Sequence, residues 1–526
     1  MKRASLAAPG TWFALIRALG LIALALLGGT LLWRLGIFLT RVFWAVGYPN
    51  ELDYGEGIVW QQMRMLVAGE AYGPIDGFPS IVFHYPPLYH ALTWALAQLG
   101  GLDQLIAGRA VSVLSALVAA LMVGLIAARL VPDSGRWTRL TCGVTAGLVA
   151  LSFWPVVAWA PLMRVDMIAC AFSLGGLYFA MRALQRPLLI HLAAIAFVAA
   201  VYSKQTMIAA PAAVFLVLLV LRPRMAAAGI STSLAVGLIP LTALAFATEG
   251  GFLRHIFLYN VNRFDVAQLW RLSHAIGMHA LYAGFAIYGF LSCWRLLTRM
   301  SGDASNWKEV KAQLGANPAA IQLLFALSYL LLASTMLILI GKVGANINYL
   351  IEWMLAASVF VGISVRQAAA AAFSPRHEGP VSSLNFLAIV LIPIAVAWQA
   401  MVLPRPVHHT AVWSQQDHVE LVRIAELIRA ADRPVISDDM VLLLRSGKQV
   451  VWEPAIFAEL ASTGFYDEQP FVQMVRNGAF EFFVTTGDRG SEPFDLRYNP
   501  AVADAMDEAY PRKREMAGFT LHMPAE

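Results

Sequence analysis

Long apolar runs are the feature that most restricts the fold of this chain, because a helix of about 20 apolar residues crosses a bilayer core. Of the 526 residues, 59% are hydrophobic and only 13% are charged, whereas soluble domains carry about 25% charged residues. The sequence therefore predicts an α-helical multi-span membrane protein. Its transmembrane helices, about 11 in number, are expected at 12–33, 105–129, 137–154, 165–184, 188–203, 207–221, 228–247, 275–297, 318–340, 349–367 and 384–403.

Basic residues recur in every second loop between these runs. They include Arg129, Arg136, Arg182, Arg222, Lys308, Arg366 and Arg376. Because positively charged loops stay in the cytoplasm, these loops are predicted to be cytoplasmic, as is the N-terminus with Lys2 and Arg3. The loops predicted to be external are 34–104, 155–164, 204–206, 248–274 and 341–348, together with the tail after residue 404. The first run is interpreted as an uncleaved anchor, because it is long for the alternative, a signal peptide.

The first external loop contains two short amphipathic stretches. Leu88–Leu99 is apolar, but a helix of about 12 residues rises only about 18 Å, short of a hydrocarbon core of about 30 Å. The stretch 58–67 places Trp60, Met63 and Val67 on one helical face. We therefore expect both to form helices in or near the membrane interface, where Trp is favoured.

The composition changes after Leu403, where the chain becomes charged and rich in Pro and Gly. Helices are predicted at 418–430 and 471–477, and strands at 434–437, 449–452 and 480–485. Alternating helices and strands indicate a small α/β domain. The chain is thus divided into a transmembrane domain, 1–404, whose first external loop is 34–104, and an external soluble α/β domain, 405–526.

Two acids follow the first span closely. Asp53 and Glu56 would stand at the mouth of a membrane cavity, where a carboxylate can act as general base for an incoming hydroxyl or amine. The same pair could instead bind a divalent cation through oxygen, and an ordinary solvated loop is the third interpretation. About thirty residues later, Pro86 and Pro87 fix the backbone that follows His84 and Tyr85. The turn would hold His84 in position to contact a phosphate or a sugar. The alternative is that the turn only starts the helix that follows.

Further polar residues lie at the external ends of the spans. An Arg164–Asp166 ion pair would mark a working cavity or lock two helices. External cations oppose the usual charge bias, so they favour an anionic ligand such as a lipid phosphate, with snorkelling to headgroups as the alternative. Glu352 could bind a sugar hydroxyl or pair with Lys342. The predicted substrate-binding residues are Tyr54, His84, Tyr85, Arg164, Asp166, Lys204, Arg263, Lys342, Asn348, Tyr349 and Glu352.

Several function classes are disfavoured. The net charge of +5 gives little support to nucleic-acid binding, and Cys142, Cys170 and Cys293 lie in apolar runs, which favours buried packing over disulfides. No P-loop, Rossmann fingerprint or zinc motif is present in the sequence. An external enzyme without a cytoplasmic nucleotide must use a substrate already activated and across the membrane, and a polyprenyl-phosphate sugar fits this requirement.

The order of these motifs resembles the GT-C superfamily of integral-membrane glycosyltransferases, of the protein mannosyltransferase and aminoarabinose transferase type (family 39/83-like). The resemblance covers roughly residues 10–405. It implies that the first-loop acid lies at the reaction centre, framed by short helices, and that a sugar is transferred with inversion from a polyprenyl phosphate. Relatives commonly have adjacent Asp and Glu, whereas Tyr54 and Gly55 separate the two acids here. Either Asp53 or Glu56 could therefore be the base.

The sequence thus predicts a glycosyltransferase of a bacterial inner membrane. Its partners are expected to be a polyprenyl-phosphate sugar donor, membrane lipid, and a lipid, glycan or protein acceptor, with no nucleic acid. Asp53 or Glu56 is the predicted catalytic base, and Lys204 and Lys342, with Arg263, neutralise the leaving phosphate. No cofactor is firmly predicted, a divalent cation at the two acids being the open alternative. A flippase or transporter for a lipid-linked sugar, or a non-catalytic membrane scaffold, are the alternative functions.

Overall fold

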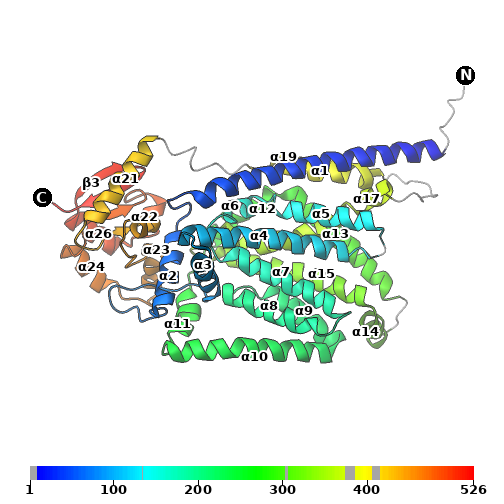
Figure 1. Cartoon of the computed structure of the whole chain (residues 1–526), viewed down its shortest axis with the longest axis horizontal. Coiled ribbons are helices and arrows are strands. Elements are labelled where there is room, and N and C mark those ends of the chain that lie inside the picture. Colours follow the sequence, from blue (N-terminus) through cyan, green and yellow to red (C-terminus); the bar gives the residue numbers. More distant parts are fainter. Residues whose placement is uncertain (1–8, 133, 303–305, 374–385, 405–414, 526) are drawn as a thin grey trace, which may run out of the picture.

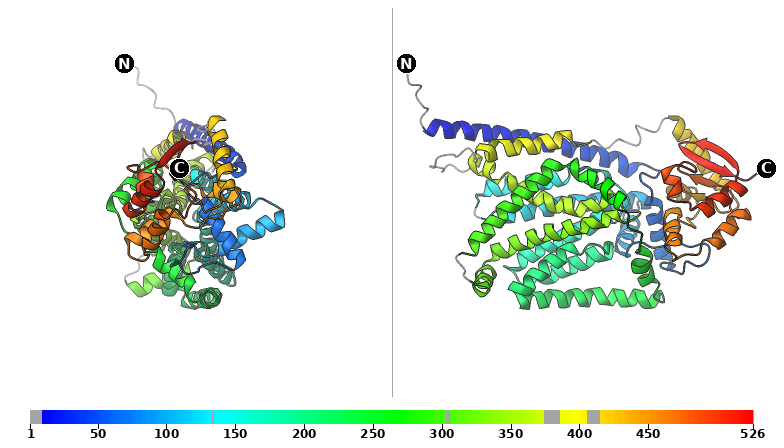
Figure 2. Two further views of the ribbon diagram at one scale, coloured as in Figure 1. Left: turned by 90° about the vertical axis from the view of Figure 1, so that its left-hand side faces the viewer. Right: turned by 180° about the vertical axis from the view of Figure 1, so that it is seen from behind.

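The computed structural model describes residues 9–132, 134–302, 306–373, 386–404 and 415–525. A bundle of long helices occupies most of the molecule, and a smaller mixed unit, residues 415–525, lies at one end of it (Figure 1). We call this smaller part the C-terminal unit. Figure 2 shows that it lies at the end of the bundle opposite Pro9, the first residue of helix α1 (Pro9–Gly47). Lys2, Arg3, Arg376 and the predicted boundary at residues 404 and 405 fall outside or at the edge of the described residues.

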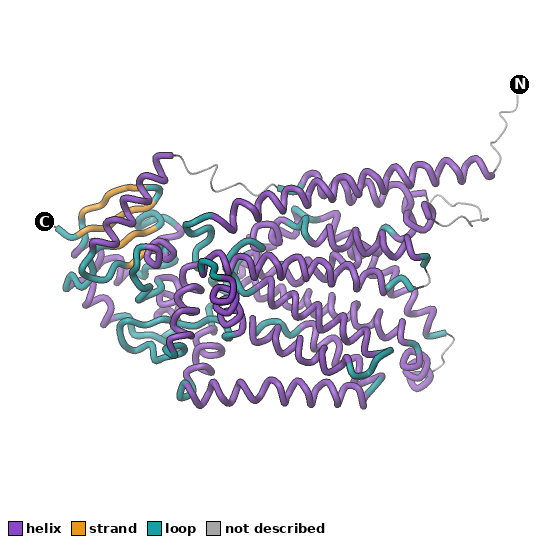
Figure 3. Tube along the Cα trace, viewed as in Figure 1, coloured by secondary structure: helices purple, strands orange, loops and turns teal. Residues whose placement is uncertain are grey.

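Each predicted span overlaps a helix of the bundle, drawn as coils in Figure 3, and residues 384 and 385 of the last predicted span lie outside the described residues. Among the described helices, six are long and apolar enough to cross a membrane. The multi-span prediction is confirmed in this coarser form, while the number of spans stays a prediction. The bundle helices are α1 (Pro9–Gly47), α4 (Gln104–Arg129), α5 (Arg136–Ala150), α6 (Trp154–Trp159), α7 (Asp166–Ala183), α8 (Leu189–Ser203), α9 (Ala209–Leu221), α10 (Pro223–Ala247), α13 (Ala280–Met300), α14 (Trp307–Ala316), α15 (Pro318–Met336), α16 (Ile351–Ser364), α17 (Arg366–Phe373), η4 (Leu387–Leu391) and α19 (Ile392–Val402).

Helix α16 forms the centre of the bundle. Its sequence is apolar on all sides apart from Glu352 and a few small polar residues, and a helix of this kind is stable only when it is buried. It packs against α4, α5 and α13. By contrast, α10 lies at the periphery, where it contacts α8 and α9 and leaves its apolar side chains exposed.

Short elements cover the end of the bundle next to the C-terminal unit. The two amphipathic stretches of the first loop form separate helices of 13 residues each, too short to span a bilayer, as predicted. Their place at a membrane surface stays a prediction. The elements at this end are α2 (Glu56–Ala68), α3 (Leu88–Gly100), α11 (Gly251–Phe257), η1 (Leu258–Asn260), α12 (Val266–Gly277), η2 (Leu337–Gly341) and η3 (Ile347–Leu350).

The C-terminal unit has a four-stranded sheet in the order β1-β2-β4-β3, in which only β1 and β2 are parallel. The predicted helices at 418–430 and 471–477 are present as α21 and α24. The β3–β4 hairpin was not predicted, because β3 reads Arg-Lys-Arg-Glu-Met and lies exposed at the sheet edge. The elements are α21 (Gln415–Ala430), β1 (Ile436–Ser437), α22 (Met440–Arg445), α23 (Pro454–Ser462), α24 (Gln469–Arg476), β2 (Phe483–Thr485), α25 (Glu492–Asp495), α26 (Pro500–Ala509), β3 (Arg512–Met516) and β4 (Phe519–Met523).

The strand predicted at 449–452 is wrong. This segment pairs with no strand of the described residues and instead contacts the first loop: the Ser80 N–H donates to the Val451 carbonyl at 3.0 Å, and the Val450 N–H donates to Gln61 at 3.4 Å. Its apolar residues are buried by this contact and by the aromatic side chains around Trp452. An apolar sequence pattern predicts that a segment is buried, but it does not identify the segment against which it packs.

The first loop and the C-terminal unit share hydrophobic clusters. Val59 and Met63 of α2 are buried together with Met440 and Leu442 of α22. Gly57 is required at this joint, because a Cβ there would lie 2.5 Å from the Met440 backbone. The first loop is consequently held between the bundle and the C-terminal unit.

Candidate active site

A cavity of about 530 Å³ lies where the bundle, the first loop and the C-terminal unit meet. Its walls come from segments far apart in the sequence, at 53–59, 84–85, 159–164, 262–268, 343–349, 453–459 and 492–499. Segments from the predicted external loops thus gather at one end of the bundle. The predicted site residues on the wall are Asp53, Tyr54, His84, Tyr85, Arg164, Arg263, Asn348 and Tyr349, whereas Glu56, Asp166, Lys204, Lys342 and Glu352 do not line the cavity.

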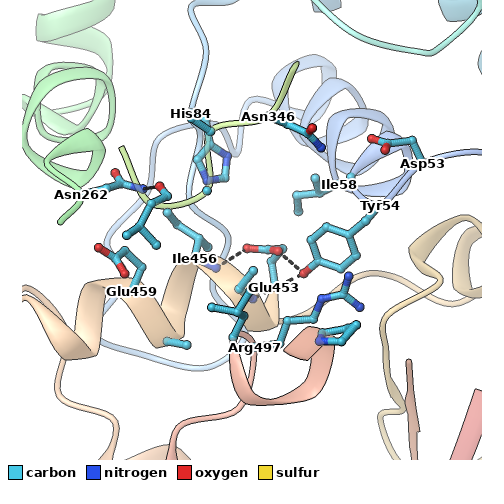
Figure 4. A pocket seen from close by; sticks show the side chains of 18 of the residues that line it. Asp53, Tyr54, Ile58, His84, Asn262, Asn346, Glu453, Ile456, Glu459 and Arg497 are labelled. Carbon is cyan, nitrogen blue, oxygen red and sulfur yellow. Dashed lines mark hydrogen bonds between the residues drawn. The ribbon is translucent and has the colours of Figure 1, made fainter. Parts of the chain in front are cut away.

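Asp53 is the first-loop acid that faces the cavity (Figure 4). Its Oδ2 accepts a hydrogen bond from Nη2 of Arg164 at 2.5 Å, and its side chain keeps 27% of its surface exposed. Burial raises the pKa of the Asp53 carboxyl, and the charge of Arg164 opposes this shift. Gly55 makes the approach of Arg164 feasible, because its φ is 100° and a Cβ would lie 2.8 Å from the guanidinium. Asp53 is therefore an accessible carboxylate beside a fixed cation.

Glu56 has a different environment, deep inside the protein. Both of its oxygens accept hydrogen bonds from Arg109, at 2.9 and 2.7 Å, and both side chains are fully buried. The Met163 and Leu52 N–H groups donate to the same carboxylate, each at 2.8 Å. Arg109 also donates to the carbonyls of residues 45, 48 and 50. Glu56 thus anchors the loop, and its environment does not support the prediction that it is a candidate base.

The two acids do not converge on a common ligand, since each holds its own arginine. Among the described residues, no group of three or more His, Cys, Asp and Glu side chains is arranged to hold a metal ion. The geometry therefore gives no support to a divalent cation shared by Asp53 and Glu56.

His84 and Tyr85 present neutral polar groups to the cavity. Burial and the nearby charge of Lys342 lower the pKa of His84 to about 3, so its imidazole is uncharged at neutral pH. Burial raises the pKa of Tyr85 to about 12, so its phenol keeps its proton. Gln205 donates to the His84 carbonyl at 2.9 Å and fixes the turn against the loop between α8 and α9.

Arg164 and Asp166 do not pair with each other, contrary to one interpretation of the sequence. Asp166 instead accepts hydrogen bonds from Lys204 at 2.6 Å, from Asn348 at 2.9 Å and from the Trp159 indole at 3.0 Å. Asp166 and Lys204 are 1% and 2% exposed. These residues form a buried network that joins α7, η3 and the loop after α8 directly beneath the cavity.

Tyr349 completes this network, because its ring lies 4.4 Å from Nζ of Lys204. A cation held by both a carboxylate and an aromatic face is already well satisfied. Lys204 therefore supports the cavity floor, and it is less suited than an unpaired cation to bind an incoming anion.

Lys342 has no ion-pair partner among the described residues. Burial and the positive charge of Lys204 lower the pKa of Lys342 to about 8. Its charge also acts on His84, which lines the cavity. Lys342 directly precedes Val343 of the cavity wall, and its charge is not engaged by an ion pair with a described residue.

Arg263, at the mouth, is 57% exposed and paired with Glu459 at 2.9 Å. Glu352 does not pair with Lys342: its carboxyl lies in the bundle beside Ser173 and Tyr329, and its Oε1 has no hydrogen-bond partner among the described residues. Arg263 therefore lines the cavity with its charge already paired, whereas Glu352 does not line the cavity.

From the sequence, the C-terminal domain was expected to cap the site or recruit the acceptor, but the residues that it contributes were not identified. Tyr54 donates its hydroxyl hydrogen to Glu453, and the guanidinium of Arg497 lies over the Tyr54 ring, 3.9 Å from its centre (Figure 4). Arg109 was not identified either, although a single arginine inside the apolar run 105–129 is itself a signal of a buried partner. No local signal identified Glu453 or Arg497, because each lies in an ordinary polar segment.

Comparison with solved structures finds ArnT from Cupriavidus metallidurans bound to undecaprenyl phosphate, with a TM-score of 0.55 at 15% sequence identity over 94% of this chain and 97% of that chain. The same protein in the apo state gives 0.49 at 14% identity over the same shares. The archaeal oligosaccharyltransferase AglB from Archaeoglobus fulgidus, in complex with an inhibitory peptide and a dolichol-phosphate, gives 0.44 at 11% identity over 86% of this chain and 69% of that chain.

No protein-family model matches the sequence. No curated protein matches it either. The likeness to ArnT at 15% identity shows the fold, and the GT-C fold predicted from the sequence is confirmed by it.

Proposed function

We propose that this protein is a glycosyltransferase that moves a sugar from a polyprenyl-phosphate-linked donor to an acceptor on the external side of the membrane. Asp53 is the general base. The observation that carries the proposal is the position of Asp53 on the wall of the cavity. That wall also includes Val343, the residue after Lys342, and His84, on which the charge of Lys342 acts. A base and a separate cation are the two groups that such a transfer needs.

An apolar groove supports the choice of a lipid-linked donor. This second cavity, of about 340 Å³, is lined mainly by apolar side chains of α8, α9, α10 and α11. Pro86 and Gln205 line the groove, while His84 and Tyr85 line the polar cavity. The His-Tyr-Pro-Pro turn therefore separates a place for a hydrocarbon chain from a place for a sugar, and the phosphate would lie between them.

The reaction follows from this arrangement. The acceptor hydroxyl gives its proton to Asp53, and the acceptor oxygen forms a bond to the anomeric carbon. The bond between that carbon and the phosphate oxygen breaks, and its electron pair leaves with the lipid phosphate. Lys342 stabilises the charge that develops there. Arg164 holds the Asp53 carboxylate in place until the acceptor arrives.

Transfer by purified protein in detergent, with radiolabelled polyprenyl-phosphate sugars and candidate acceptors, tests the proposal. Asp53→Asn is expected to lower the rate by about 10²–10⁴-fold, the usual contribution of a general base. Asp76→Asn is the matched control, because Asp76 is an exposed acid of the same loop. Full activity of Asp53→Asn would overturn the assignment of the base. Movement of labelled lipid across liposomes without any sugar transfer would favour the transporter instead.

A further inference from the structure

Tyr54, the residue after Asp53, is held by the C-terminal unit. Its hydroxyl donates to Glu453 and accepts a hydrogen bond from the Ala455 N–H at 3.4 Å. The guanidinium of Arg497 covers one face of its ring. Figure 4 shows these groups gathered around the Tyr54 side chain, with Asp53 beside it on the cavity wall. We call Glu453 and Arg497 the tyrosine socket.

The socket is itself fixed within the C-terminal unit. Glu453 is 3% exposed and caps α23, since its Oε2 accepts a hydrogen bond from the Ile456 N–H at 2.7 Å. Arg497 donates to Asp438 at 2.6 Å and to Thr486 Oγ1 at 3.0 Å. Side chains with this many partners have few alternative rotamers. The socket therefore transmits the position of the C-terminal unit to Tyr54.

The backbone around Tyr54 connects the socket to the candidate base. Nη2 of Arg164 donates both to Oδ2 of Asp53 and to the carbonyl of Tyr54. A rotation of the Tyr54 peptide therefore changes the geometry of Arg164 and Asp53 together. Glu51 also fixes this stretch, because its carboxylate accepts hydrogen bonds from the N–H groups of residues 55, 57 and 440.

We propose that the C-terminal unit positions the base, because the tyrosine socket sets the orientation of Asp53 through Tyr54. Glu453 and Arg497 are positioning residues, and this role rests on the proposed function. The socket is not needed to dock the unit, because docking has other contacts. Arg445 of α22 forms two hydrogen bonds to Asp103, at 2.6 and 2.9 Å, and a buried apolar cluster joins the two parts.

The test is a double-mutant cycle with Tyr54→Phe and Glu453→Gln. Each single variant is expected to lower kcat by about tenfold to a hundredfold, as for a catalytic group displaced by less than about 1 Å, with the donor KM unchanged. The double variant should be no slower than the slower single variant, because both substitutions act on the same hydrogen bond: Phe has no hydroxyl to donate, and Gln replaces the charged acceptor by a neutral one. Arg445→Gln is the matched control: it breaks a docking contact without touching Tyr54, and kcat should stay within about twofold.

Three results would overturn the proposal: unchanged kcat in both single variants, additive losses in the double variant, or an equal loss in Arg445→Gln. A second readout does not depend on turnover. Carbodiimide labelling of Asp53 with an amine, followed by mass spectrometry across pH, reports the environment of its carboxyl group. Tyr54→Phe and Glu453→Gln should shift this profile relative to wild type. Wild-type protein without transfer would refute the proposed function, whereas an unshifted labelling profile would refute the positioning role.

Discussion

Isosteric amide substitutions separate the roles of Asp53 and Glu56. Glu56→Gln removes a charge that is fully buried, and its partner Arg109 is fully buried as well. Loss of one member of a buried pair typically costs about 3–5 kcal/mol, because the other charge stays in a low-dielectric site without compensation. Four N–H groups of Arg109, Met163 and Leu52 donate hydrogen bonds to this carboxylate. In the Gln variant, the amide NH₂ would face some of these donors and could not accept their hydrogen bonds.

Asp53→Asn is expected to affect the transfer rate and to leave the stability of the fold nearly unchanged. The Asp53 and Arg164 side chains are 27% and 14% exposed, so water reaches the pair. Exposed ion pairs contribute about 0–1 kcal/mol, and the amide oxygen of Asn can still accept from Arg164. We therefore expect little change in stability and a large loss of transfer rate.

Both variants can be compared in one experiment. Folded yield and thermal unfolding in detergent report stability, and transfer per folded molecule reports catalysis. Glu56→Gln should fold poorly while its folded fraction keeps much of the wild-type rate, and Arg109→Gln should lower stability similarly. The reasoning is refuted if Glu56→Gln has wild-type stability but no activity, or if Asp53→Asn unfolds while the rate per folded molecule is unchanged.

Further predictions concern the cations, the buried acids and the groove. Burial and the charge of Lys204 lower the pKa of Lys342 to about 8, so the ammonium charge is lost as pH rises through about 8, and the donor KM should rise over that range. The Lys342→Arg variant stays protonated and should keep a low donor KM to higher pH. Asp166→Asn should destabilise the fold by about 3–5 kcal/mol, because it leaves the buried Lys204 without its carboxylate partner. Glu352→Gln should cost less than about 1 kcal/mol, because Glu352 forms no ion pair with a described residue. Thermal unfolding of both variants checks this difference. Val201→Trp, which fills the apolar groove, should raise the KM of long-chain donors and leave short-chain donors unaffected, and an equal rise for both would place the lipid elsewhere.

The sequence allowed much of the fold to be predicted, because membrane helices follow from local hydropathy. The apolar runs fell on helices, and the lengths of α2 and α3 followed from the short amphipathic stretches. Local pattern failed at 449–452, where an extended apolar segment pairs with the first loop instead of a sheet. It also failed at β3, whose exposed charged residues resemble a loop.

The site was partly predictable for a different reason. Polar residues in the loops predicted to be external were identified because charge near a membrane is costly without a purpose, and many of them do line the cavity. Their pairing was not predictable. Arg164 and Asp166 are two residues apart, yet they bind different partners, Asp53 and Lys204.

The amino-acid sequence by itself determined that this chain forms a multi-span helical bundle, because burial in lipid requires long apolar segments whatever their neighbours are. It also determined that acids and cations gather in alternate loops. Only the tertiary structure decided which acid is accessible, because Arg109 of α4 neutralises Glu56 while Asp53 remains at the cavity. Ion pairs form between whichever groups packing brings together, and no local pattern records that choice. The same holds for Tyr54 and Glu453, which are 399 residues apart.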